Sequence, residues 1–480
     1  MSFLKRRKSL DAEQSIGSGS RLRRTLGWPH LVALGVGAII GTGIYTLVGI
    51  GAGRAGPAVI LAFVVAGLVC VCAALAYAEM ATMMPVSGSA YTYTYAVFGE
   101  LPAWFVGCAL ILEYTVVCSA VAVGWSGYAV GFLKSVGIEL PVELIQGPDA
   151  GGVFNVPAAV IVFAVAAMLL VGARESATVS GILVIVKVIA LLVFMVIAFK
   201  AFQSSNLEPF MPYGFQSHVE GGEKKGVMAA AAIIFFAFYG FDAVSTAAEE
   251  TRDPARDLVR GIIGSMVVCT IIYIAVAAAA LGAMPFTQFA GSSEPLALVL
   301  RTLQAPLAAN LIAAAAIVAL PTVILAFLYG QTRIFFVMAR DGLIPTWFGG
   351  LSGKSGAPVI VTISTAILVS VIAGLFPLSA IAEVANAGTL VAFIAVASCV
   401  MALRVLEPGR KRVFRTPLVW LVGPFAVFGC IYLFTSLAAF TIKFFFICSA
   451  VGIVLYFLWG VHKSRLKDVQ IEKKLSSTGL

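Results

Sequence analysis

The sequence contains few charged residues, since only 11% of its 480 positions are Asp, Glu, Lys or Arg. A soluble domain carries about 25%, so a soluble globular fold is excluded. Histidine is scarce, with three residues, and neither these nor the eight cysteines are spaced as metal ligands. We therefore expect no metal site and no cofactor. An HExxH run or another cluster of catalytic residues is also missing from the apolar segments, which argues against an intramembrane enzyme.

Long apolar runs take the place of these features. The mean hydropathy is +1.01 and 60% of the residues are hydrophobic. Many of the runs reach the roughly 20 residues that are needed to cross a bilayer. We expect an all-α polytopic membrane protein with twelve transmembrane helices embedded in a lipid bilayer. Their predicted centres lie near Gly41, Val69, Leu112, Phe163, Ile189, Phe236, Ile272, Ala319, Ile367, Ile394, Phe428 and Val454.

The net charge of +9 does not indicate a nucleic acid partner, because the basic residues follow the membrane topology. When the twelve spans alternate sides, most of the 32 Lys and Arg residues fall on the side of the N-terminus. By the positive-inside rule, that side is the cytoplasm. We expect both termini to be cytoplasmic in a multi-pass protein of the plasma membrane. The charged N-terminal stretch predicts a disordered cytosolic arm rather than a signal peptide.

The spans form two sets of five, followed by two more. An odd number of spans in each set places the second set upside down relative to the first, which is the plan of many secondary transporters. The predicted organisation is a cytosolic N-terminal arm at 1–27, a first five-helix repeat at 28–201, an extracellular loop at 202–225, a second, inverted five-helix repeat at 226–404, helices 11 and 12 at 405–463, and a cytosolic tail at 464–480.

Glycines interrupt the first and the sixth span. Gly41 and Gly43 lie in the middle of the first span, where each costs roughly 1 kcal/mol relative to alanine. Gly240 interrupts the sixth span within Phe236–Asp242. One such span is equally well explained by close packing of helices through small residues. The pair in corresponding positions favours discontinuous helices 1 and 6 around a transporter's binding site.

Charged residues inside the spans indicate functional positions, because each costs about 2.5–3.5 kcal/mol at the bilayer centre. Glu113 and Lys187 lie at about the depth of the two interruptions, so we expect one site at the middle of the bilayer. Glu79 and Glu383 lie nearer to span ends, where solvation at the interface is expected. Lys187 stands alone among apolar residues, and a buried lysine can exchange a proton near neutral pH. We expect Lys187 to couple transport to protons; a purely structural Lys–carboxylate pair is the alternative.

The interruptions also predict the chemistry of the ligand. Free amides at the start of the half-helix after Gly41 attract a carboxylate, and carbonyls freed at both interruptions attract an ammonium. A site with both poles suits the carboxylate and amino groups of an amino acid. Glu113 either receives a basic side chain of the substrate or pairs with another buried group.

Several motifs carry a resemblance to a known family. They are Gly37–Ile44, Tyr77–Met80, Pro85–Tyr91, and Phe236–Asp242 running into Ala247–Thr251. With these motifs, over about residues 26–463, the chain resembles the amino acid–polyamine–organocation superfamily, specifically bacterial members of its cationic amino acid transporter branch. The resemblance implies a LeuT-type fold of five plus five inverted helices and two extra helices, with helices 1 and 6 discontinuous.

The resemblance also implies roles for individual residues. Ile39, Thr42 and Gly43 would hold the carboxylate of the substrate, and Phe236, Ala237 and Tyr239 its amine. Glu113 would line the side-chain end of the site, Lys187 would stand at a vacated sodium position, and Asp242 would act in inner gating with Tyr273. The predicted substrate-binding residues are thus Ile39, Ile40, Gly41, Thr42, Gly43, Glu113, Phe236, Ala237, Tyr239 and Gly240.

The sequence therefore predicts a secondary active transporter, not an enzyme. We expect it to carry neutral and/or cationic amino acids by alternating access, with a proton as the coupling ion. An exchanger of amino acids or polyamines on the same fold is the alternative. A channel is disfavoured, because the buried charges are few and lie at one depth. The expected partners are the amino acid, the proton and the lipid bilayer, with no nucleic acid, and a small membrane partner stays open.

Overall fold

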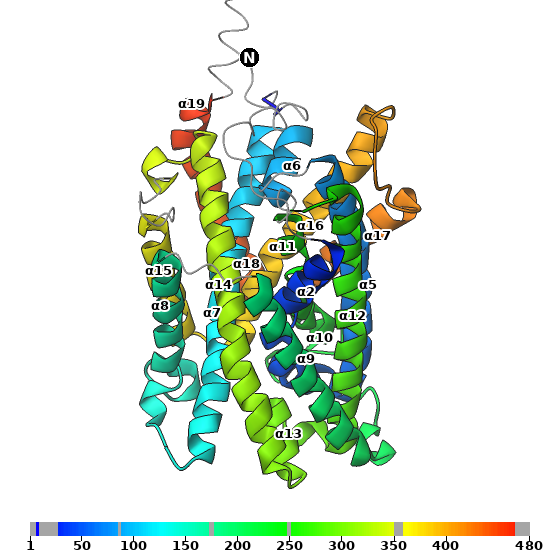
Figure 1. The fold of residues 1–480 in the computed structure, drawn as a ribbon, viewed down its shortest axis with the longest axis vertical. Helices are drawn as coiled ribbons and strands as arrows, with labels where there is room; N and C mark the ends of the chain where they lie inside the picture. The colour runs from blue at the N-terminus through cyan, green and yellow to red at the C-terminus, as the bar shows by residue number, and fades with distance from the viewer. Residues whose placement is uncertain are drawn as a thin grey trace, which may run out of the picture.

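The computed structural model describes residues 6–8, 27–84, 88–171, 177–246, 251–349 and 359–465. Within these residues the chain forms an elongated bundle of helices with one short hairpin (Figure 1). Most of the predicted arm at 1–27 and of the tail at 464–480 lies outside the described residues, as do 85–87 and 247–250 of the family motifs.

Eight helices of the described chain are long and apolar enough to cross a membrane, and four shorter helices are also apolar. The long helices are α5 (Val59–Met83), α7 (Glu100–Ser135), α9 (Ala177–Lys200), α12 (Pro254–Ala283), α14 (Pro306–Arg340), α16 (Leu378–Leu406), α17 (Val419–Ser436) and α18 (Ala439–Leu455), which continues in helical form to Lys463. The shorter ones are α2 (Trp28–Ile39), α8 (Val156–Val171), α10 (Val227–Ile234) and α15 (Val359–Leu375). The prediction of an all-helical polytopic membrane protein is confirmed.

Short elements connect or continue these helices. The short helices are α3 (Thr42–Tyr45), α4 (Leu47–Ala55), α6 (Ser89–Val97), α11 (Phe241–Thr246), α13 (Pro295–Thr302) and α19 (Val461–Lys463). A 3-10 turn, Phe235–Phe238, follows α10, and a π-helical turn, Tyr456–Gly460, follows α18. The antiparallel strands β1 (His218–Glu220) and β2 (Glu223–Lys225) form the hairpin.

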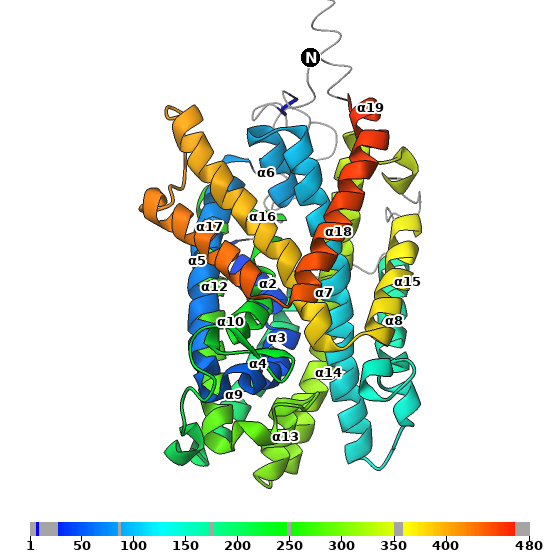
Figure 2. The ribbon, with the colours of Figure 1, turned by 180° about the vertical axis from the view of Figure 1, so that it is seen from behind.

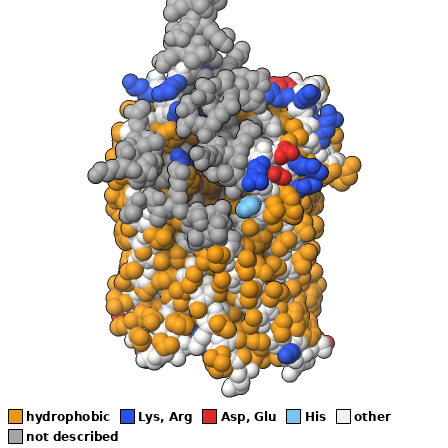
Figure 3. All heavy atoms as spheres, in the orientation of Figure 1, with side chains coloured by type: hydrophobic (Ala, Val, Ile, Leu, Met, Phe, Trp, Pro, Cys, Tyr) orange, Lys and Arg blue, Asp and Glu red, His pale blue; other side chains and the backbone are white. Residues whose placement is uncertain are grey.

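The packing is centred on α7, which lies against α14 and α16, while α2 packs against α9 and α12 (Figures 1 and 2). Apolar side chains cover the middle of the face drawn in Figure 3, and Lys and Arg gather at the end where the chain begins. A belt of apolar surface with charge at its edge is the arrangement that a bilayer requires.

Glu79 and Glu383 do not lie in solvent, so the sequence-based expectation for both is wrong. Each is at most 3% exposed. Glu79 forms ion pairs with Arg404 (2.8 Å) and Arg412 (3.2 Å), and Glu383 pairs with Arg54 (2.5 Å). Because a buried carboxylate is costly without a partner, these pairs explain how both residues are tolerated.

The N-terminal arm is ordered where the structure describes it, which corrects the expectation of disorder for Arg6–Lys8. Arg6 is only 6% exposed and donates to the Val461 carbonyl oxygen at 3.1 Å. Arg6–Lys8 and the last described helix, α19, therefore lie at the same end of the molecule (Figure 1).

Candidate substrate-binding site

The first interruption lies between α2 and α3. The helical pattern of α2 ends where the Ile40 N–H donates to the Val36 oxygen at 2.9 Å. Ile40 is extended and Gly41 is also outside helical geometry, after which Thr42 begins α3. The chain thus leaves the helix where Gly41 predicted it, and the last carbonyls of α2 lose their partners within the helix.

The second interruption follows the 3-10 turn Phe235–Phe238. Tyr239 is extended, and Gly240 has φ +106°, which favours glycine strongly. A Cβ atom on Gly240 would lie 2.7 Å from the Ala38 carbonyl carbon, and one on Gly43 would lie 2.3 Å from the Ala237 Cα. The two interruptions therefore cross each other in direct contact, and glycine is required on each side.

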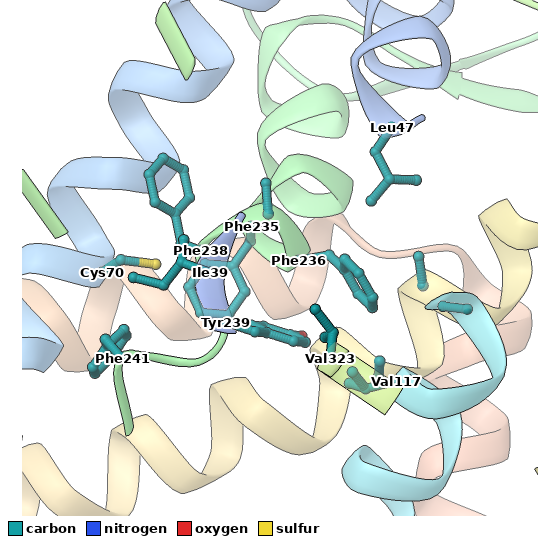
Figure 4. Packing of buried hydrophobic residues seen from close by; sticks show 14 of the residues in the cluster. Ile39, Leu47, Cys70, Val117, Phe235, Phe236, Phe238, Tyr239, Phe241 and Val323 are labelled. Atoms are coloured by element: carbon teal, nitrogen blue, oxygen red, sulfur yellow. The ribbon is translucent and has the colours of Figure 1, made fainter. Parts of the chain in front are cut away.

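A small cavity lies where they cross. The space open to the centre of a water molecule is about 10 Å³, close to the minimum for one water molecule. Backbone and side chains of both interruptions form one wall, and apolar side chains of α7 and α14 form the other (Figure 4). The lining residues are Ala38, Ile39, Gly41, Thr42, Gly43, Val117, Val121, Phe236, Tyr239, Val323 and Phe327.

Six of the ten predicted substrate residues line the cavity, and the other four, Ile40, Glu113, Ala237 and Gly240, do not. Five lining residues were not predicted as substrate residues: Ala38, Val117, Val121, Val323 and Phe327. Val117 and Val121 lie one and two turns after Glu113 on α7, so helical spacing could have pointed to them. Val323 and Phe327 of α14 carried no such signal. Glu113 itself does not line the cavity but lies one turn away, buried, and its Oε2 has no hydrogen-bond partner among the described residues.

Two side chains from distant helices satisfy freed carbonyls at the end of α2. The Lys187 Nζ, from α9, donates to the Gly37 oxygen at 2.8 Å and to the Thr322 hydroxyl at 3.4 Å. The Tyr273 hydroxyl, from α12, donates to the Ile39 oxygen at 2.7 Å. Both side chains are buried, so the first interruption depends on donors that lie far away in the sequence.

The second interruption is held by neutral groups and by Asp242. The Tyr239 hydroxyl donates to the Asn386 amide oxygen, and the Asn386 Nδ2 donates to the Ala232 oxygen at 2.6 Å. Asp242 accepts hydrogen bonds from the Tyr114 hydroxyl (3.2 Å) and from the Gly240 amide (3.3 Å). Hence the two predicted gating residues are anchored at different interruptions, since the Tyr273 hydroxyl bonds to the first and Asp242 to the second.

A hydrogen bond joins α7 and α14, the two helices of the apolar wall. Pro321 lies inside α14 and lacks the N–H that would bond to the Ile317 oxygen. The Trp125 indole of α7 donates to that oxygen at 2.8 Å. The two helices are therefore joined at the level of the cavity.

Comparison with known proteins places the chain among membrane transporters. The family model described as "Amino acid permease" matches residues 26–457. The branched-chain amino acid permease BcaP of Bacillus subtilis is 44% identical over 468 residues, which cover 96% of this chain and 99% of that protein. The methylthioribose transporter of the same organism is 38% identical over 97% of this chain and 100% of its own length. The vacuolar cationic amino acid transporter 2 of Arabidopsis thaliana is 37% identical over 85% of this chain and 64% of its own length.

Proposed function

The chain belongs to the amino acid permease family, and we propose that it is a proton-coupled transporter of branched-chain amino acids that works by alternating access. The observation that carries this proposal is the cavity between the two interruptions. Its polar wall offers backbone groups of opposite partial charge, which suit a zwitterion. Its apolar wall suits an aliphatic side chain.

The proposed orientation follows from this division. The substrate carboxylate bonds to the amides at the start of α3, around Thr42 and Gly43, and the ammonium bonds to carbonyls near Ile39 and Phe236. The aliphatic side chain then contacts Val117, Val323 and Phe327. Burial of such a side chain contributes about 1.5–3 kcal/mol. The cavity is smaller than an isobutyl group, so we expect Phe236 or Phe327 to rotate on binding.

Cationic amino acids fit this wall less well. A lysine or arginine side chain needs a carboxylate, and Glu113 is one turn away from the lining. BcaP, which shares 44% of its residues with this chain over the aligned length, is named for branched-chain substrates. Both observations favour aliphatic substrates over cationic ones.

Lys187 is the proposed coupling residue. Its ammonium supports a carbonyl that the end of α2 has released. When Lys187 loses a proton, it loses its positive charge and one of its three N–H donors. The bond from Lys187 to the Gly37 oxygen of α2 is then weaker when the substrate is released. Asp242 and Tyr273, which bind the two interruptions, act with it in gating.

We further propose twelve crossings of the plasma membrane, with 28–201 and 226–404 as inverted repeats and both termini in the cytoplasm. The eight long and four shorter apolar helices match this number. The interruptions fall in the first helix of each repeat, as expected for this plan.

Uptake into proteoliposomes tests the function. With the outside made acidic, labelled leucine, isoleucine and valine should accumulate above the level of vesicles without a pH gradient, whereas arginine and methylthioribose should not. Uptake that occurs only with amino acid inside the vesicles would instead establish the exchanger. Accumulation of arginine in preference to leucine would refute the proposed specificity.

A further inference from the structure

Arg6–Lys8, near the beginning of the chain, and residues 461–465, near its end, meet at one end of the bundle. Arg6–Lys8 lie against the ends of α6, α7 and α14 and against residues 461–465 (Figures 1 and 2). Two acidic residues, Glu100 and Asp341, receive the contacts. We call Arg6, Lys8, Glu100, Asp341 and Ser464 the terminal clasp.

Glu100, the first residue of α7, is the first anchor. Its side chain is fully buried. It accepts hydrogen bonds from the Arg6 guanidinium (3.0 Å), the Tyr456 hydroxyl (2.8 Å), the Tyr95 hydroxyl (3.0 Å) and the Ser464 hydroxyl. The Glu100 amide in turn donates to the Arg6 oxygen at 3.0 Å. The Glu100 carboxylate thus joins the start of α7 to Arg6, to α6 and to the C-terminal segment.

Asp341, directly after α14, is the second anchor. It accepts from the Lys8 ammonium (2.9 Å) and the Tyr91 hydroxyl (2.6 Å), and its backbone oxygen accepts from the Arg465 amide (3.1 Å). Lys8 also lies over the Tyr95 ring, 5.2 Å from its centroid.

The two terminal segments are fitted closely to this surface. Gly342 has φ +79°, and a Cβ atom there would lie 2.3 Å from the Lys463 oxygen, so only glycine admits the C-terminal segment at this distance. In the N-terminal segment, Arg6 is buried, Arg7 is exposed and Lys8 is half-buried. This alternation is typical of an extended segment that is bound through one face.

The clasp lies at the end of the molecule toward which α11 leads from the cavity (Figure 1). The terminal clasp joins the ends of α6, α7 and α14. The next described helix along the chain is α2, which ends at the first interruption. Two cations face two carboxylates away from solvent, and buried pairs of this kind are costly to separate singly. Release of all the partners together is therefore a discrete event rather than gradual fraying.

We propose that the terminal clasp locks the cytoplasmic side of the transport pathway and is released when that side opens. Arg6 and Lys8 are the positioning residues of this lock, and Glu100 and Asp341 are their anchors. The inference rests on the alternating access proposed above, but on neither the identity of the substrate nor the coupling ion.

The rate at which a reagent on the cytoplasmic side labels a single cysteine in the pathway tests the lock in the full-length chain. Ser245 is a buried residue of α11, the helix that leads from the cavity toward the clasp (Figure 1). In a version whose eight native cysteines are replaced, Ser245→Cys is exposed to a membrane-impermeant maleimide in inside-out vesicles. The Arg6→Ala, Lys8→Ala double variant should be labelled several-fold faster than the parent. Arg7→Ala, which removes the same type of charge from the exposed position between them, should be labelled at the parent rate. Equal labelling of both variants would overturn the proposal.

Two further experiments, a deletion and a charge swap, exclude misfolding as the cause of faster labelling. Deletion of residues 1–8 removes the N-terminal partners without changing a packed helix and should also speed labelling; an unchanged rate would overturn the proposal. Lys8→Asp and Asp341→Lys should each speed labelling, and their combination should return it toward the parent rate, which a merely unfolded protein would not do. Labelling needs no substrate, so failure of the uptake experiment would leave this result intact.

Discussion

The two interruptions are alike in the backbone and different in what holds them. At the first, freed carbonyls of α2 receive a lysine ammonium and a tyrosine hydroxyl from α9 and α12. At the second, Tyr239 is fixed by Asn386, whose amide also binds the end of α10. A lysine can lose its charge, and an asparagine cannot. In the proposed mechanism, loss of the Lys187 proton loosens the first interruption, whereas the bonds of Tyr239 and Asn386 at the second do not depend on a proton.

The largest effect is expected at Lys187. Lys187→Ala should abolish pH-driven uptake, because it removes the proposed proton carrier, which donates to the Gly37 carbonyl. Exchange of internal for external substrate, which needs no net proton movement, should persist. Uptake is measured in proteoliposomes over a range of imposed pH gradients, with Lys200→Ala, an exposed position on the same helix, as the control. An unaltered pH dependence in Lys187→Ala would eliminate the coupling role.

Gly240→Ala should reduce uptake by at least about tenfold. The backbone conformation of Gly240 costs another residue about 1–3 kcal/mol, and the new methyl group would overlap Ala38. Gly291→Ala adds the same methyl group where it meets no atom within 4 Å and should be neutral. Transport rates and thermal melting of both purified variants give the comparison. Wild-type rates in Gly240→Ala would mean that the crossing of the two interruptions is not needed for transport.

Tyr273→Phe removes the hydroxyl from the Ile39 carbonyl and should slow uptake roughly fivefold, since one hydrogen bond contributes about 1 kcal/mol. Its response to pH should be retained, because Lys187 is untouched. Tyr432→Phe, at an exposed tyrosine of α17, is the matched control. If uptake by Tyr273→Phe no longer responded to pH, the proposal that Lys187 alone carries the proton while Tyr273 only holds the Ile39 carbonyl would be wrong.

The smallest effect concerns the wall opposite the interruptions. Val323→Ala widens the cavity and should raise the preference for phenylalanine over valine by roughly fourfold, because a methylene contact is worth about 0.8 kcal/mol. Val318→Ala, on the exposed side of α14, should leave the preference unchanged. Competition of each amino acid against labelled leucine measures the ratio. An identical ratio in both variants would exclude Val323 from contact with the substrate side chain.

The interruptions could be predicted because glycine is conspicuous in an apolar span, and Lys187 because a charge is conspicuous there. Val323 and Phe327 could not, since an apolar side chain looks the same in the sequence whether it faces lipid, a neighbouring helix or a cavity. The partners of Glu79 were missed for another reason: Arg404 lies 325 residues further along the chain, and only the fold brings the two together. The burial of Arg6 was missed for the same reason. A basic terminal segment indicates exposure to solvent, and the sequence does not show that Glu100 lies beside it in the fold.

The bond between Trp125 and the Ile317 carbonyl gives the protein an optical probe of its own. Indole emission shifts with the polarity and hydrogen bonding around the ring, and this indole lies one turn from Val121 of the cavity wall. The chain has only six tryptophans, so replacement of the other five by phenylalanine would leave a fluorophore whose spectrum reports, without any attached dye, whether α7 and α14 stay together while substrate passes.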